Sequence, residues 1–142
     1  MQGATQVQFV GNLTADPELR YTPSGTAVAN FTVAVNNRVR KDGEWKDGAP
    51  TFYRVAVWQD YGEHVADSLS KGDQVLVVGR LITRQYEGND GETRSSLDVT
   101  AEEIGPTLRW TTAKLSKVPR KDDGGQQTGA AKGGSFNDDP PF

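Results

Sequence analysis

The sequence predicts an all-β domain of five strands with one short helix between the third and fourth strands, followed by a disordered C-terminal tail. Short segments that alternate polar and apolar residues are separated by turn-forming residues, and only one segment has helical spacing. Beyond Pro119 the composition becomes rich in Gly and Gln, without hydrophobic periodicity. We therefore expect a folded domain over residues 1–118 and a flexible tail over residues 119–142.

The first two expected strands are half-buried. In residues 6–13, Val7 and Phe9 alternate with polar neighbours, as on a strand with one face toward a core. A turn signal follows, and the alternation resumes over residues 27–36, where Phe31 shares a face with other apolar side chains. Both segments are typical of strands that cover a core with one face.

A charged loop over residues 38–50 leads to the third expected strand, residues 51–58. The helix follows over residues 61–70, with Asp60 as its expected N-cap and Gly72 as its expected C-cap signal. Its apolar residues are spaced four apart. The helix is therefore predicted to be short and amphipathic.

Residues 74–86 are the fourth expected strand, residues 87–92 a hairpin connection, and residues 93–104 the fifth expected strand. Five strands with a helix between the third and fourth match the order of a five-stranded OB-fold barrel. That fold commonly binds oligonucleotides or oligosaccharides, but the fold alone does not fix the function.

The composition excludes several kinds of site. The chain has no cysteine and a single histidine, His64, so thiolate and histidine-cluster metal sites are excluded, and we expect no cofactor. The N-terminal residues lack the basic and apolar regions of a secretory signal, and no apolar run approaches the roughly 18 residues of a membrane span. We therefore expect a cytoplasmic protein that does not bind membranes.

The net charge of −3 belongs to the tail. Residues 1–121 contain equal numbers of acidic and basic side chains, whereas residues 122–142 contain four aspartates and one basic residue, Lys132. Coulomb attraction of the neutral domain to phosphate is therefore modest, and aromatic contacts with bases must supply more of any affinity for nucleic acid.

Strand parity selects a candidate nucleic-acid surface. In residues 51–58 the core face is Tyr53, Val55 and Val57, which leaves two aromatic residues and an arginine facing outward. The fourth strand adds an outward row of cations that ends in a tyrosine, and stacked bases would cover such rings. The residues of this predicted surface are Phe52, Arg54, Trp58, Arg80, Arg84 and Tyr86.

The same residues are also consistent with roles that do not involve nucleic acid. Phe52 fits a subunit interface as well, and the remaining set fits a solvated face. Trp45 is either a base-stacking loop tip or an anchor folded back on the barrel, and the cations of its loop are either phosphate contacts or solvated charges. The candidate phosphate contacts are Arg38, Arg40, Lys41 and Lys46, with Lys71 on the turn before the fourth strand.

Several motifs, in this order, resemble those of bacterial single-stranded DNA-binding proteins. They are FVGNL at 9–13, DPELRY at 16–21, PSG at 23–25, AVANFTVA at 27–34, KGDQV at 71–75, VGRL at 78–81 and DDPPF at 138–142. The resemblance implies that Phe52, Trp58 and Tyr86 stack on bases. A fourth stacking position of the family falls near Val39, where this chain departs from the pattern and Trp45 is a candidate substitute.

The resemblance also implies a nucleoid-associated homotetramer that takes part in DNA replication, recombination and repair. Residues 105–118 resemble a clamp strand that braces subunits, with Leu108, Trp110 and Leu115 at the interface; the alternative is a hairpin packed on its own barrel. The acidic tip of the tail is expected to dock DNA-maintenance proteins, because its prolines favour an extended chain with charge and a terminal ring. The tip consists of Asp138, Asp139, Pro140, Pro141 and Phe142.

Two other classes of function are weaker. An enzyme would need clustered carboxylates, but the adjacent Glu102 and Glu103 point to opposite faces of a strand, so we expect no catalytic site. An OB-fold accessory factor that binds RNA or protein would share the aromatic face but would have little use for the acidic tip. A replicative protein, a paralogue for recombination or DNA uptake, and a phage-encoded version would share all of these features.

Overall fold

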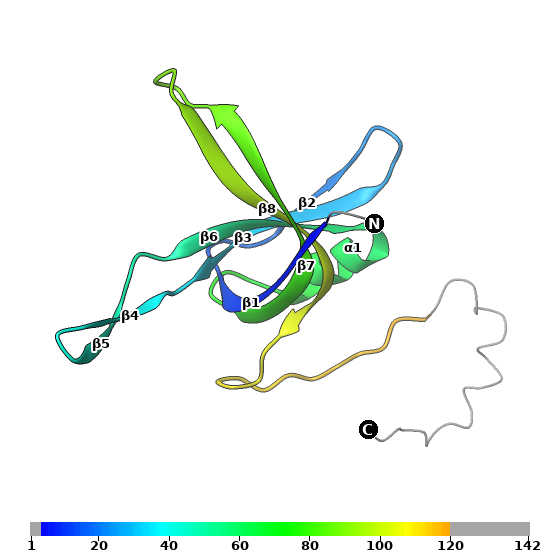
Figure 1. The fold of residues 1–142 in the computed structure, drawn as a ribbon. Helices are drawn as coiled ribbons and strands as arrows, with labels where there is room; N and C mark the ends of the chain where they lie inside the picture. Colours follow the sequence, from blue (N-terminus) through cyan, green and yellow to red (C-terminus); the bar gives the residue numbers. More distant parts are fainter. Residues whose placement is uncertain (1–3, 120–142) are drawn as a thin grey trace. The chain divides into compact units, whose positions relative to one another are not determined.

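The computed structural model describes residues 4–119. Eight strands and one helix follow one another along this part of the chain (Figure 1). They are β1 (Thr5–Leu13), β2 (Glu18–Tyr21), β3 (Ala27–Val35), β4 (Arg38–Lys41), β5 (Glu44–Asp47), β6 (Thr51–Trp58), α1 (Gln59–Ser68), β7 (Gln74–Glu87) and β8 (Thr93–Pro106).

Five of the strands pair in a closed ring. β1 pairs with β7, β7 with β8, β8 with β6, β6 with β3, and β3 again with β1. Each of these pairs is antiparallel except β6 with β8, which is parallel. The short strand β2 lies outside the ring, on the free edge of β3. The closed ring with a helix between β6 and β7 is the predicted all-β OB architecture.

The hairpins of β7 with β8 and of β4 with β5 both extend away from the ring (Figure 1). The longer hairpin consists of the outer parts of β7 and β8, where most side chains beyond Leu81 are exposed. The shorter one is formed by β4 and β5 and pairs with no other described strand. The exposed side chains of both hairpins are therefore accessible to a ligand and do not contribute to the core.

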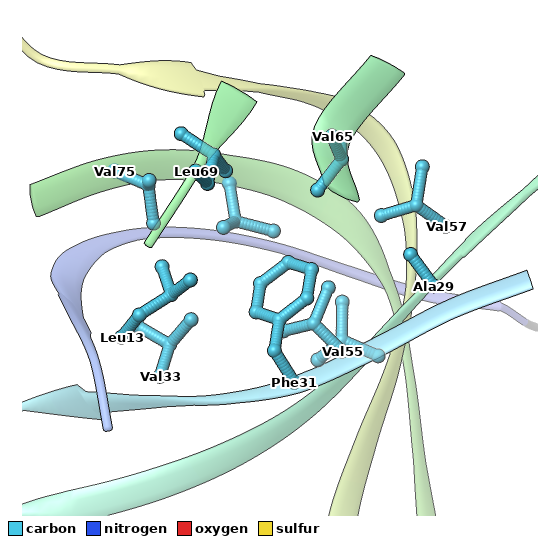
Figure 2. Packing of buried hydrophobic residues seen from close by; sticks show 11 residues of the cluster. Leu13, Ala29, Phe31, Val33, Val55, Val57, Val65, Leu69 and Val75 are labelled. Atoms are coloured by element: carbon cyan, nitrogen blue, oxygen red, sulfur yellow. The ribbon is translucent and has the colours of Figure 1, made fainter. Parts of the chain in front are cut away.

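The core is built from the alternating apolar residues of the ring strands and one face of α1 (Figure 2). Phe9 and Tyr53 stack at its margin, with ring centroids 4.2 Å apart. The buried side chains of the cluster are Leu13, Ala29, Phe31, Val33, Val55, Val57, Val65, Leu69, Val75, Val77 and Val99. The parity predicted for the third and fourth strands is thus the parity observed in β6 and β7.

Helix α1 begins and ends earlier than predicted. Its N-cap is Trp58, the last residue of β6, because the chain enters the helix directly through Gln59, which has φ of 65°. Asp60 is therefore not the N-cap but lies in the first turn. Gly72, predicted as the C-cap signal, lies beyond the actual C-cap Leu69; with φ of 91° it turns the chain into β7 and donates its N–H to the carbonyl oxygen of Leu13.

The prediction of a charged loop over residues 38–50 is wrong in part, because β4 and β5 form a two-stranded hairpin there. Both of its faces are exposed, so the sequence lacks the alternation of polar and apolar residues that marks a half-buried strand. Asp42 and Gly43, both with positive φ, make the tight turn between the two strands.

The compact unit that contains the ring ends at Trp110, and a second unit begins at Thr111. Residues 107–119 form neither a strand nor a packed hairpin in the described chain, and Leu108, Trp110 and Leu115 are largely exposed. The tail from residue 120 onward, with its expected docking tip, lies outside the described residues. Within residues 4–119, no helix has the length and apolar character needed to cross a membrane.

Candidate nucleic-acid interface

The side of the sheet that faces away from the core carries most of the predicted site residues. Register places Arg54 of β6 beside Asp98 of β8, and Asp98 opposite Ile82 of β7. On the other side of Arg54 lies Thr32 of β3. These four residues form one continuous row across four strands, because directly paired residues point to the same side of a sheet. We call this side of β3, β6, β8 and β7 the outer face.

The aromatic side chains of the outer face are exposed despite their size. Phe52 is 53% exposed, Trp58 44% and Tyr86 48%. Phe52 and Trp58 share the parity of Arg54 on β6, and Tyr86 shares the parity of Ile82 on β7. The rings are therefore accessible to stacking partners.

Arg54 differs from the other arginines of the outer face. It lines a groove of about 240 Å³ between the loop after β1 and strands β3 and β6, together with Asp16, Asn30 and Thr32. Among residues 4–119 it forms no ion pair. Its guanidinium group is thus available to an anionic ligand at the centre of the face.

The two arginines predicted on β7 are instead paired with carboxylates of β8. Arg84 Nε lies 3.2 Å from Asp98 Oδ2, and Arg80 Nε lies 3.5 Å from Glu102 Oε2. Both pairs are partly exposed, so solvent weakens them, but each one cancels a positive charge on the face. Phosphate can bind these arginines only in competition with the β8 carboxylates.

Trp45 is exposed on the β4–β5 hairpin. It pairs with Arg40, whose guanidinium carbon lies 5.8 Å from the centroid of the indole ring. Val39 pairs with Lys46 and therefore points to the opposite side of the hairpin from Trp45. The ring of Trp45 consequently leaves the hairpin on the other side from Val39, the position where the family pattern has an aromatic residue.

The remaining predicted cations lie on separate elements. Arg38 forms an exposed ion pair with Asp47 on the β4–β5 hairpin, and Lys41 stands at the end of β4. Lys71 lies on the turn between α1 and β7, where its backbone N–H donates to Asp16. Lys71 precedes β7 whereas Tyr86 lies near the end of that strand, so the structure does not bring these two predicted residues together.

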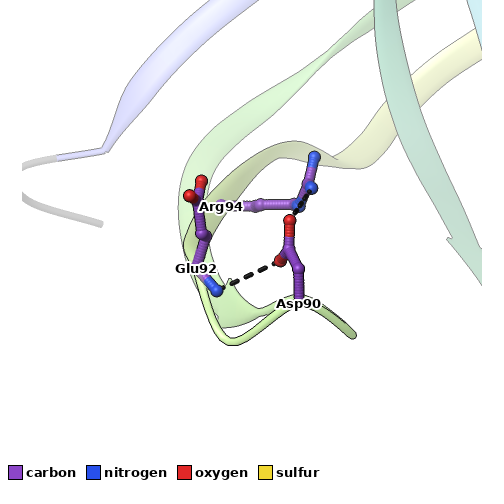
Figure 3. A network of polar contacts seen from close by, with 3 residues as sticks. All are labelled: Asp90, Glu92 and Arg94. Atoms are coloured by element: carbon purple, nitrogen blue, oxygen red, sulfur yellow. Dashed lines mark hydrogen bonds and ion pairs between the residues drawn. The ribbon is translucent and has the colours of Figure 1, made fainter.

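The tip of the β7–β8 hairpin holds a cluster that sequence reasoning did not select (Figure 3). Arg94 pairs with Tyr86 in register and forms a 2.8 Å ion pair with Asp90. The backbone N–H of Glu92 also donates to Asp90, and this hydrogen bond is the main cause of the lowered pKa of that carboxyl group. Arg94 therefore lies on the same side of the hairpin as Tyr86.

Sequence reasoning missed Asp98 and Arg94 for different reasons. Parity was applied to the third and fourth strands but not to residues 93–104, where it would have placed Asp98 on the outer face. Arg94 could have been found by pairing residues across the expected hairpin connection. In the described residues no three His, Cys, Asp or Glu side chains are grouped as metal ligands would be.

Comparisons with known proteins show which family this chain is similar to. A family model described as the single-strand binding protein family matches residues 4–107. The single-stranded DNA-binding protein of Mycobacterium bovis is 47% identical over 164 residues, an alignment that covers 100% of both chains. That of Mycolicibacterium smegmatis is 53% identical over 122 residues, which cover 84% of this chain and 74% of the relative.

Solved structures give the same result. The crystal structure of a small single-stranded DNA-binding protein from Streptomyces coelicolor matches with a TM-score of 0.68 and 31% sequence identity, over 75% of this chain and 97% of the other. Together these similarities confirm the family resemblance drawn from the sequence motifs and the predicted fold class.

Proposed function

The chain belongs to the single-strand binding protein family, and on that premise we propose that it binds and protects single-stranded DNA without sequence preference, during replication, recombination and repair. The mode of binding is base stacking on the aromatic side chains of the outer face. The protein acts by binding and not by catalysis, and we place it in the cytoplasm with the nucleoid.

One observation carries this proposal: three large rings, those of Phe52, Trp58 and Tyr86, stay about half exposed on one side of a sheet whose other side is well packed. Exposed rings of this size cost solubility unless a ligand covers them. Each stacked base contributes ~1–3 kcal/mol, and every base has a π-face, so stacking is tolerant of sequence.

Phosphate contacts supply a smaller share of the affinity. The candidate cations without a carboxylate partner among the described residues are Arg40, Lys41, Lys46, Arg54 and Lys71. Binding should weaken as salt rises, with a slope of about 0.7 per phosphate neutralised on a single strand. A flat salt titration would exclude these residues as the main phosphate contacts.

A fluorescence titration tests the proposal directly. The tryptophan emission of the full chain should be quenched by oligo-dT, and binding to duplex DNA of equal length should be far weaker because its bases are not accessible. Poly-U of the same length tests the preference for DNA over RNA. Equal affinity for duplex and single strand would contradict the proposal.

The assembly that we propose is a homotetramer. Val10 of β1 and Leu76 of β7 pair in register on the outside of the ring and are 44% and 45% exposed, a patch suited to contact with another subunit. Residues 105–118 remain the candidate clamp, since Trp110 is 80% exposed in the single chain. Light scattering on a chain that ends at Val118 should return four subunits, and a monomer at micromolar concentration would refute the assembly.

We further propose that the acidic tip of the tail recruits DNA-maintenance proteins. The support is the sequence: Asp138 and Asp139 offer charge to a basic rim, and Phe142 offers a ring and a carboxylate to a pocket that holds a cation. A tetramer would present four copies of the tip, which raises its effective concentration for partners.

A further inference from the structure

The outer face carries a carboxylate, Asp98, between the arginines Arg54 and Arg84, although the face was expected to bind a polyanion. Asp98 lies on β8, the strand between β7 and β6, and therefore between the two strands that carry the rings and arginines. It has Ile82 opposite on one side and Arg54 beside it on the other. A nucleic-acid strand that crosses the face along the row of Ile82 and Arg54 passes over this carboxylate.

The Asp98 carboxylate is held in place by both of its oxygens. Ser96 Oγ donates a 2.9 Å hydrogen bond to Oδ1, and Arg84 Nε lies 3.2 Å from Oδ2. The Asp98 side chain is 31% exposed, against 56% for Arg84. The carboxylate therefore sits lower on the face than its partner and keeps a fixed position on it.

We propose that Asp98 determines specificity: it neutralises Arg84 and keeps phosphates away from β8, and so favours a nucleic-acid strand that turns its bases, not its backbone, toward this part of the sheet. This inference rests on the proposed function. A single strand can present its bases to Phe52 and Trp58 and hold its phosphates above them. A duplex has its bases paired inside and can offer only phosphates, which the Asp98 charge repels.

Electrostatics gives the effect its sign. At a partly exposed site a carboxylate repels a phosphate a few ångströms away, and added salt screens this repulsion. Asp98 also neutralises Arg84, so its removal both ends a repulsion and frees a cation. If Asp98 instead only positioned Arg84 as a phosphate ligand, its removal would weaken binding. The two roles therefore predict opposite changes.

Asp98→Asn tests the proposal, because asparagine keeps the shape of the side chain and can still accept the Ser96 hydrogen bond. At low salt the variant should bind oligo-dT about three- to tenfold more tightly, with a salt slope steeper by about 0.7 for one added phosphate contact. Its affinity for duplex DNA should rise by a larger factor, which lowers the ratio of single-strand to duplex affinity. Asp98→Thr, which also removes the charge and favours a strand, should behave in the same way.

Two controls separate this effect from a general change in charge. Asp67→Asn removes an equal charge from the exposed surface of α1 and should leave the salt slope and the single-strand to duplex ratio unchanged. Asp98→Glu keeps the charge and should retain the wild-type ratio. Circular dichroism and thermal melts should show that each variant is folded.

Weaker oligo-dT binding by Asp98→Asn, or an unchanged single-strand to duplex ratio, would overturn the role of Asp98 and leave the proposed function intact. Failure of the wild-type protein to prefer oligo-dT over duplex would instead refute the proposed function itself. The wild-type titration therefore distinguishes the two failures.

Discussion

Trp58 is the last residue of β6 and the N-cap of α1, so two elements fix the direction of its ring. It pairs with Val28 of β3, which pairs in turn with Arg20 of β2. Trp58 thus lies where the outer face meets the helix, and the proposed stacking contact would form there.

Trp58→Ala should weaken oligo-dT binding by ~1–3 kcal/mol, because one stacked base is lost. The measurement is an equilibrium titration with a labelled oligonucleotide. Tyr21→Ala is the matched control: Tyr21 is 59% exposed but points to the other side of β2 from Arg20 and is hydrogen-bonded to Glu63 of α1. Unchanged affinity of folded Trp58→Ala would remove this residue from the site.

The side-chain hydroxyl of Tyr61 joins α1 to the end of β8 through two hydrogen bonds with the backbone of Ile104. It donates to the carbonyl oxygen of Ile104 at 2.9 Å and accepts from the N–H of Ile104 at 2.8 Å. Burial raises the pKa of Tyr61 above its usual value of 10.0, and the nearby Glu103 carboxylate raises this pKa further, while the Ile104 hydrogen bond lowers it.

Tyr61→Phe should lower the free energy of unfolding by about 1–2 kcal/mol, because two backbone groups of Ile104 lose their partner. The pH dependence has a defined sign. The raised pKa means that folding favours the neutral phenol, so this stabilisation is complete below pH 10 and is lost as pH rises through the higher folded-state pKa. Urea unfolding at pH 8 and pH 11 should therefore show a smaller loss for Tyr61→Phe than for wild type; an equal loss would contradict the assignment.

At the scale of elements, β1 closes the ring by pairing with β7 over most of its length and with β3 at its end. Gly11 lies at this change of partner, and a Cβ added there would lie 2.5 Å from the carbonyl oxygen of Ala34 and 2.7 Å from a methyl carbon of Val33. Glycine is required because β1 and β3 approach each other closely.

Gly11→Ala should destabilise the domain by roughly 1–3 kcal/mol through overpacking at this closure point. Thermal unfolding measures the effect. Gly105→Ala is the control, since nothing lies within 4 Å of a Cβ added there. If both variants unfold at the wild-type melting temperature, β1 and β3 can move apart without loss of stability, and close packing at Gly11 is not required.

The elements that could be predicted from the sequence are those with one face in the core. The third strand was predicted with the bounds of β6, whose side chains alternate between more and less buried along its whole length. The hairpin of β4 and β5 was missed because neither of its faces is buried, and β2 because four residues give too short a pattern. The start of α1 was misplaced because positive φ at Gln59 is not marked by a glycine.

The features of the candidate site likewise fall into those that the periodicity of one strand predicts and those that depend on pairing between strands. Parity alone places Phe52, Trp58 and Tyr86 on an exposed side, and the structure agrees with that placement; their contact with DNA stays a prediction. The pairing of Arg84 with Asp98 depends on the register between two strands, which the hairpin connection sets and which the periodicity of a single strand cannot give.

For the whole molecule, charge separates the two ends of the chain: residues 1–121 are neutral and the remainder carries the net charge of −3. DNA binding and partner recruitment are therefore expected to depend on different segments. Because the two segments differ, a variant is expected to lose DNA binding or partner recruitment separately.

Deletion of Phe142 should leave oligo-dT affinity nearly unchanged and abolish the capture of helicases, nucleases and recombination mediators from a cell lysate. The measurement is a pull-down with the immobilised full chain and its shortened form, quantified for the same partners. Deletion of Gly133 and Gly134, which shortens the linker but keeps the tip, is the control and should retain capture. Equal capture by the chain without Phe142 would exclude the tip as the docking site.

The closed ring also determines when the domain can fold during translation. Thr5 of β1 can pair only after Leu81 of β7 has been synthesised, and Tyr53 of β6 can pair with β8 only after Leu97 has been synthesised. At translation rates of about 5–20 residues per second, Thr5 is synthesised roughly 4–15 seconds before Leu81. During that interval the edges of β1 are open, and pairing with a neighbouring nascent chain competes with closure of the ring. The barrel is therefore a structure that forms only once translation of the domain is nearly complete.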